Sequence, residues 1–480
     1  MLYTRVPFLC LVGVTIAVVS TIGISFASDI KKTASDTIQK EFTEALDLET
    51  AVKFAQFNDP WLVGNEHSED AILSSSVAAG SLSDPTISIS MANLPTDSLN
   101  FDQEAMTQAK IGISQIFPAG DSLAIRKRQL QLQGSQFPHQ RDNRKAEVRV
   151  IVGQLWLNTY KQQESIAIIR KNWALFEQLT DIAESSYSTA LGNSRQQDLV
   201  RAQLELTRLE DRLTVLHQKQ EMYQQQLSEW LNDYFHDEYS EDNRQRIQLN
   251  TIHFSLSRKL PDINLLNQEF YKSVEPVDTE ILFKKLSTHP ALKAVDQKIK
   301  TSNAGIKLAK QKYKPKWGVN AGYGFRADDP MGNDRADLFS IGMTFSVPLF
   351  TANRQDMEVQ SAKSTASAVK TEKWQLLRKL MASFEASKAQ FFRLNQRQTL
   401  YQTQLLPQMH EQAEASLTAY TNDDGDFAEV VRARIAEIDA EISALSIDVE
   451  RQKSIIQLNY FFTISTSEAS TSDLQLGDGK

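Results

Sequence analysis

The sequence predicts a mostly α-helical chain that also carries four β-strands, and three observations lead to this fold class. Two very long stretches are rich in Ala, Gln, Glu, Arg and Leu and show no strand alternation, which is typical of helices. Four short stretches alternate apolar with small or polar residues, which is typical of strands. The two halves of the chain share a register, because three prolines recur at an offset of 230 residues.

The composition is that of a folded, mildly acidic protein without thiol chemistry. The formal net charge is −8 and no basic stripe dominates, which excludes a general nucleic-acid binder. The single cysteine, Cys10, lies in an apolar N-terminal run. The mature chain is therefore expected to have no disulfide, thiolate metal site or cysteine nucleophile.

Residues 1–27 are predicted to be a secretory signal peptide. Arg5 supplies the positive end, residues 6–24 form an apolar run, and residues 25–27 form a small-residue cleavage site. The alternative is an uncleaved membrane anchor, because the apolar run approaches the length of a membrane span. Bulky residues on both sides of Cys10 disfavour lipid attachment there.

The first repeat is expected over residues 28–235. It begins with a helix and continues with strands at about 85–92 and 109–117, where Ile and Met alternate with Ser, Ala and Gly. A helical hairpin then follows over residues 119–235. Its long Ala, Gln and Leu-rich stretch predicts a helical path on the order of 100 Å.

A polar, irregular connector is expected at residues 236–284, between the two repeats. The second repeat, residues 285–465, has the same order of helix, strand pair and helical hairpin, with the hairpin at 350–463. Residues 466–480 are mostly Ser, Thr, Gly and Asp, so they are predicted to form a disordered tail.

The strands of the second repeat, at 316–326 and 338–347, alternate most clearly. Large apolar side chains occupy one face and small or polar ones the other, because successive side chains leave opposite faces of a pleated strand. The residues of the apolar face are Trp317, Val319, Tyr323, Phe325, Phe339, Ile341, Met343, Phe345 and Val347.

Each long helix is expected to turn back on itself as a coiled-coil hairpin. Gly134, Pro138 and Pro407 predict kinks or joints along the way. The returning helices begin near Asp198 and Glu429, and they carry apolar residues at a three-four spacing. The tips share a Tyr-x-x-x-x-Gly signal, formed by Tyr187, Gly192, Tyr420 and Gly425.

The alternating strands also fit a soluble sandwich, but nothing in the chain is left to cover their apolar face. A secreted chain can instead close the sheet into a membrane barrel, with the apolar face in lipid and the other face in water. Strands of about ten residues have the length that a tilted span needs. Four strands are too few to close a barrel, so several copies must contribute strands to one barrel.

The chain resembles the TolC family of outer-membrane efflux channels over essentially its mature length. The residues that carry the resemblance are KPKWGVNAGYGFR at 314–326, SIGMTFSVPLFTANRQD at 340–356, the two tips, and the DLVRAQ and EVVRAR segments after them. The VPLF and RQD segments resemble those of the family branch that serves heavy-metal cation pumps.

This resemblance implies a homotrimer with a 12-stranded β-barrel in outer-membrane lipid and an α-helical periplasmic tunnel. The connector and the C-terminal tail would form an equatorial region. The partners implied are a periplasmic adaptor protein and an inner-membrane efflux pump of the RND type, in a Gram-negative bacterium. Such a channel passes substrate out without chemistry, so neither catalysis nor a cofactor is expected.

The resemblance also places a gate at the hairpin tips, where family channels carry two acidic rings on the second hairpin. The first ring maps to Glu429, which is acidic here, and the second maps to Arg432, which is not. The alternatives are a solvated turn before the helix and a charge that complements the helix dipole. The gate and tip candidates are Asp423, Asp424, Asp426, Glu429, Arg432, Asp198 and Arg201.

No nucleophile elbow, phosphate loop or zinc-protease motif occurs in the sequence. The seven histidines are scattered without ligand spacing, so no metal site is expected. Two other readings stay open. A periplasmic adaptor would also have a signal peptide and a coiled-coil hairpin, although the duplication argues against it, and a secreted coiled coil would leave the strands unexplained.

Overall fold

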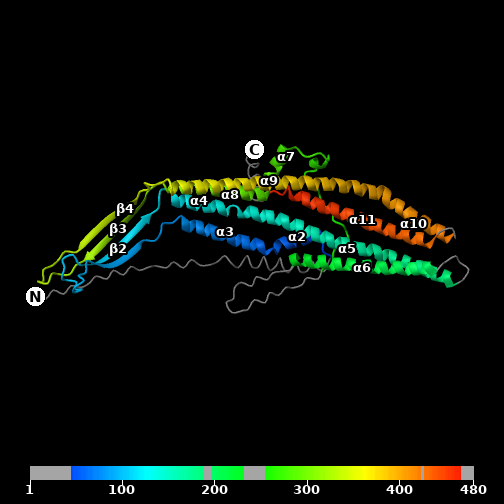
Figure 1. Cartoon of the computed structure of the whole chain (residues 1–480), viewed down its shortest axis with the longest axis horizontal. Coiled ribbons are helices and arrows are strands. Elements are labelled where there is room, and N and C mark those ends of the chain that lie inside the picture. The colour runs from blue at the N-terminus through cyan, green and yellow to red at the C-terminus, as the bar shows by residue number, and fades with distance from the viewer. Residues whose placement is uncertain (1–44, 189–195, 232–253, 423–425, 466–480) are drawn as a thin grey trace, which may run out of the picture.

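The computed structural model of this 480-residue chain is an elongated molecule with a β-sheet at one end and long helices along the rest (Figure 1). It describes residues 45–188, 196–231, 254–422 and 426–465. The predicted signal peptide and tail lie outside these residues. So do Cys10, Gly192, Asp423, Asp424 and Gly425.

The four predicted strands form one antiparallel sheet in the order β1-β2-β3-β4. Their bounds are Thr86–Ala92, Gln108–Phe117, Lys316–Phe325 and Leu338–Ser346. The strands of each repeat pair as a hairpin, and β2 pairs with β3 from Ala109 opposite Phe325 to Phe117 opposite Trp317. The two halves of the chain are therefore joined along the middle of a single sheet.

Four helices lead away from the sheet and lie side by side in the order α3-α4-α8-α9 (Figure 1). Two of them begin at the repeated prolines, which suits a residue whose missing N–H would have no helical partner in the first turn. Their bounds are α3 Pro60–Ala79, α4 Ser122–Gly134, α8 Pro290–Gln311 and α9 Gln355–Leu400.

The far half of the molecule consists of two helical hairpins, as predicted (Figure 1). In the first, α5 (Phe137–Ser188) packs along α6 (Gln196–Leu231). In the second, α10 (Leu406–Thr421) packs along α11 (Phe427–Tyr460), and α11 also packs on α5. The hairpins thus form one layer in the order α10-α11-α5-α6.

The predicted helix joints are present. Helix α4 ends at Gly134 and α5 begins at Phe137, so the path breaks where Gly and Pro disfavour a continuous helix. Between α9 and α10 the chain forms one π-helical turn, Tyr401–Leu405, followed by Pro407 in the first turn of α10. This π turn is the local adjustment that lets the long helix bend without a gap.

The main hydrophobic core lies around the middle of the molecule, where short elements wrap the long helices. These are α2 (Leu48–Phe57), a 3₁₀ turn at Gln268–Tyr271 and α7 (Thr279–Leu286). The core contains the fully buried Trp156 and Phe384, and the Trp156 Nε1 donates a hydrogen bond 3.1 Å long to the Leu46 carbonyl. The described part of the predicted connector is largely irregular, although α7 already begins inside it.

His289 joins two of these elements from a fully buried position. It caps α8, since its Nδ1 accepts a hydrogen bond from the Ala291 N–H at 3.2 Å, and its Nε2 lies 3.1 Å from the Tyr460 carbonyl. Nε2 must therefore carry the proton in the neutral ring. Burial lowers the pKa of His289 from the usual 6.5 to about 4, and the Tyr460 carbonyl opposes this shift only in part.

Candidate functional site

The register of the sheet brings most of the large apolar residues of all four strands onto one face. Because antiparallel partners point the same way, three of the apolar residues predicted on β3, Trp317, Val319 and Tyr323, stand beside Phe345, Met343 and Phe339 of β4. The same face continues across β2 and β1. One complete row comprises Ile89, Ile111, Tyr323 and Phe339.

Nothing in the described chain covers this apolar face. The exposed fraction is 84% for Ile89, and 69% for both Phe339 and Ile341. Eight of the nine residues predicted for the lipid face lie on it, and Val347 follows directly after β4. Exposure of this extent, sustained over four strands, marks a surface that is completed by lipid or by another molecule.

The opposite face of the sheet is mostly small and polar, although it also carries Ile116 and Leu338. All five strand glycines, Gly112, Gly318, Gly322, Gly324 and Gly342, alternate onto it. Polar side chains lie close to three of these glycines. A Cβ at Gly112 would stand 2.8 Å from the Ser88 hydroxyl, and a Cβ at Gly342 would stand 2.7 Å from the Asn320 amide oxygen. At Gly324 it would meet the Gln108 amide oxygen at 2.5 Å. On this face, polar side chains therefore lie over the glycines and close to the backbone of the sheet.

The predicted gate residues of the second hairpin gather at the start of α11. Asp426 caps this helix, since its side chain accepts a hydrogen bond from the Ala428 N–H at 3.1 Å. Glu429 follows in the first turn and is exposed, and the exposed Arg432 donates its Nε to the Ala428 carbonyl at 3.1 Å. Asp426 and Glu429 both lie at the positive end of the helix dipole, so a purely structural role fits them as well as a gate.

The first hairpin tip is described only in part. Tyr187 lies in the last turn of α5 and Asp198 in the first turn of α6, while Arg201 follows as an exposed residue. The two hairpins of one chain are held together further up by an ion pair between Arg212 of α6 and Asp439 of α11. Tyr420 of the second tip packs edge-on against Phe427, with ring centroids 5.6 Å apart.

A buried arginine near the second tip was not predicted. The Arg434 guanidinium lies 2.5 Å from Glu414 of α10 and 2.8 Å from Glu437, and His410 Nδ1 lies 2.6 Å from the other oxygen of Glu437. Burial alone would lower the pKa of Arg434, but its hydrogen bonds to Glu414 and Glu437 raise it, and those to Arg434 lower the pKa of Glu414. This Arg434 cluster ties α10 to α11.

The sequence held a signal for this cluster. Phe427 and Val431 stand seven and three residues before Arg434, and Ile438 stands four residues after it. Arg434 therefore occupies a position of the apolar stripe. A charged residue in such a position is expected to be buried only when it is paired.

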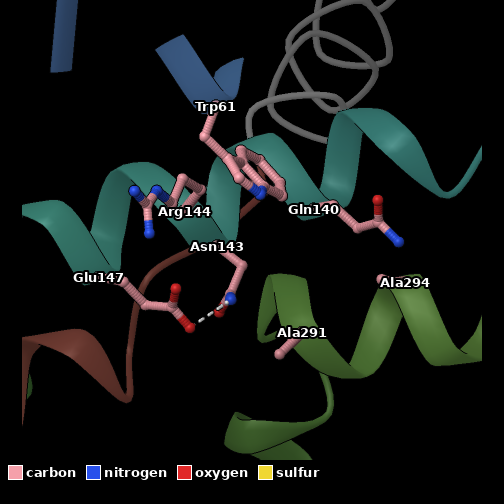
Figure 2. Close-up of a pocket in the computed structure, with 7 residues that line it drawn as sticks. All are labelled: Trp61, Gln140, Asn143, Arg144, Glu147, Ala291 and Ala294. Atoms are coloured by element: carbon pink, nitrogen blue, oxygen red, sulfur yellow. Dashed lines mark hydrogen bonds between the residues drawn. The ribbon is translucent and has the colours of Figure 1, made fainter. Parts of the chain in front are cut away.

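A hollow of about 280 Å³ lies near the joint of α4 and α5 (Figure 2). Trp61 of α3 overhangs it, Arg144 and Glu147 line it from α5, and α8 closes it with two alanines. The Arg144 charge is taken up by the buried Asp59, with Nε and Oδ2 2.7 Å apart. Glu147 accepts a hydrogen bond 2.8 Å long from Asn143, so both ionic groups of the lining already have partners.

The described residues contain no group of three or more His, Cys, Asp or Glu side chains able to hold a metal ion. Among the helices of residues 45–188, 196–231, 254–422 and 426–465, none is long and apolar enough to cross a membrane.

Comparison with known proteins shows the fold. No protein-family model matches the sequence, and the search of curated proteins found no match. Among solved structures, the CmeC outer-membrane channel of Campylobacter jejuni is similar with a TM-score of 0.68 and 13% identity, over 89% of this chain and 88% of that one. The outer membrane protein VceC of Vibrio cholerae gives 0.67 and 10%, over 87% and 96%.

The open-state MtrE outer-membrane channel of Neisseria gonorrhoeae is similar over 87% of this chain and 89% of that one, with a TM-score of 0.64 and 13% identity. At such identities the likeness establishes the fold alone. The chain therefore has the fold of outer-membrane channels of the TolC type, as its motifs predict, with both strand pairs and both helical hairpins included.

Proposed function

We propose that this chain, which has the fold of outer-membrane channels, is itself the outer-membrane channel of a tripartite efflux system. It acts as a passive conduit rather than an enzyme. The observation that carries the proposal is the four-stranded sheet with one uncovered apolar face and one small, polar face. Such a sheet is stable only where lipid covers the first face and water the second.

Assembly follows from the sheet edges. The outer edges of β1 and β4 carry unpaired N–H and C=O groups, since β1 pairs only with β2 and β4 only with β3 within the described chain. Unpaired edges cannot face hydrocarbon, so they must pair with another copy. Three copies would give the 12-stranded barrel that family members form, and the helical layers below would close into a periplasmic tunnel.

The likeness to outer-membrane channels also indicates the partners of this chain. A homotrimer of this kind would dock at its hairpin tips on a periplasmic adaptor protein and an inner-membrane pump of the RND type. Heavy-metal cations are a candidate cargo, supported by the VPLF and RQD segments and by the acidic residues Asp426 and Glu429 at the second tip. In a trimer these carboxylates would occur three times around the axis and favour cations.

Planar bilayer recording tests the proposal. The purified mature protein should form discrete conducting channels that prefer cations over anions. Replacing Asp426 with Asn and Glu429 with Gln should lower that preference, because the tip would lose six carboxylates per trimer. An absence of channels would contradict the conduit, whereas channels with unchanged selectivity would remove these two residues from the gate.

A further inference from the structure

The two faces of the sheet differ in ionisable groups as well as in polarity. Among the four strands, acidic side chains are absent, and the two basic ones, Lys110 and Lys316, both lie on the small, polar face. Lys110 stands between Ser90 and Gly324 near the start of β2, at the end of the sheet far from α4, whereas Lys316 begins β3 at the end close to α8. A lysine on the lipid face would cost about 2–4 kcal/mol at the bilayer midplane, so their common face is the water-facing one.

Gly324 gives the Lys110 side chain room. A Cβ at position 324 would stand 3.6 Å from the Lys110 Cγ, so the stem of the lysine lies across the glycine. Among the described residues, the exposed Lys110 ammonium forms no ion pair with a carboxylate. The ammonium therefore remains an uncompensated charge on the face that lines the pore.

The loops beyond this end of the sheet have the opposite sign. Residues 93–107 and 326–337 contain seven carboxylates and two arginines. Both arginines bind backbone carbonyls of the neighbouring loop. Arg326 reaches Ala105 at 3.2 Å, and Arg335 reaches Asp102 at 3.1 Å. These contacts hold the loops together at the mouth, so the mouth is acidic and the pore wall beneath it is basic.

We propose that Lys110 is a selectivity-determining residue of the channel. One copy from each chain forms a positively charged ring inside the barrel, and the ring favours anionic over cationic solutes in this segment. This inference rests on the proposed function, because only a closed barrel of several copies places these lysines around one axis. The ring opposes the acidic hairpin tips, so cations selected at the tips meet a barrier before they leave.

A charge series at this position tests the proposal by reversal potential in a salt gradient across a planar bilayer. Lys110→Gln should raise the cation-to-anion permeability ratio roughly twofold or more, because the pore wall loses its positive ring. Lys110→Glu should raise the ratio further, and Lys110→Arg should leave it unchanged. The matched control is Lys272→Gln, which removes the same charge from an exposed site beside the 3₁₀ turn, away from the sheet.

The series is repeated with Glu429→Gln in the same chain, so that selectivity at the tips does not mask the barrel. If the cation-to-anion permeability ratio rises from Lys110→Arg to Lys110→Gln to Lys110→Glu, with or without Glu429→Gln, the ring is supported. Channels whose ratio moves no more with Lys110→Glu than with the control would overturn it. Failure of every variant and of the parent protein to conduct would instead count against the proposed channel function.

Discussion

The sheet and the middle of the molecule bury their apolar side chains to very different degrees. In the middle, Trp156 and Phe384 are completely buried among residues of the same chain. In the sheet, Ile89 and Ile341 keep most of their surface exposed although they belong to regular strands. Since apolar burial is the main driving force of folding, the middle can be stable within one chain, whereas in the proposed channel the sheet is completed by lipid and by further copies.

The largest effect is expected from removing a side chain of the buried core. Phe384 packs edge-on against Phe461 and Phe462, with ring centroids 5.8 and 5.5 Å away. Phe384→Ala should lower the free energy of unfolding by about 3–5 kcal/mol, because it leaves a cavity. Thermal unfolding followed by helical circular dichroism measures this. Leu400→Ala, at an exposed site of the same helix, is the control and should change it by about 0.5 kcal/mol or less.

The sheet should respond to charge on one face only. Ile341→Arg places a cation on the predicted lipid face near the middle of β4 and should cost about 2–4 kcal/mol of membrane stability. Ser340→Arg, one residue earlier on the opposite face, should be tolerated because water reaches it. Outer-membrane fractionation and heat-stable trimer formation distinguish the two. Equal loss in both variants would contradict the assignment of the faces.

A pH effect should arise in the middle region from His289. Above pH 6.5 the ring is neutral in both the folded and the unfolded chain. As the pH falls, the unfolded chain takes up a proton, whereas the buried ring does so only near its pKa of about 4. The free energy of unfolding should therefore fall with pH through this window, by about 2 kcal/mol at pH 5.

His289→Asn should remove most of this pH dependence, because asparagine does not titrate and still caps α8. The comparison is made between melting temperatures at pH 7 and pH 5 for both proteins. If the melting temperatures of the two proteins decline in parallel, the loss at low pH comes from other groups.

The smallest effect is expected in the Arg434 cluster. Glu414 is half exposed, so Glu414→Gln should cost about 1 kcal/mol or less. The effect should be local, seen as faster amide hydrogen exchange in α10, because Arg434 keeps Glu437. Glu411→Gln, an exposed site on the same helix, is the control. Equal exchange in both variants would show that the pair with Glu414 does not hold α10 in place.

Much of this architecture follows from patterns in the sequence. Alternation predicts the ends of the four strands to within one residue, because side-chain direction along a strand depends only on local geometry. The prolines at positions 60 and 290 mark helix starts, since the missing N–H favours the first turn. The pairing of β2 with β3 was not predicted, because alternation tells which way a residue faces but not which strand lies beside it.

The parts that the sequence did not reveal depend on contacts between distant segments. Phe270, Phe384 and Phe462 meet in one core although each segment alone looks irregular or simply helical. The Arg434 cluster likewise needs α10 and α11 side by side. The assignments of Asp426, Glu429 and Arg432 to a gate stay predictions, because they depend on the neighbouring copies around the axis.

The mass of the purified mature protein tests the central claim most directly, since the claim is that its apolar sheet face needs lipid and its sheet edges need other copies. Light scattering in detergent should give a protein mass of three chains, and the protein should lose solubility once detergent is removed. A monodisperse monomer in detergent-free buffer would contradict the account.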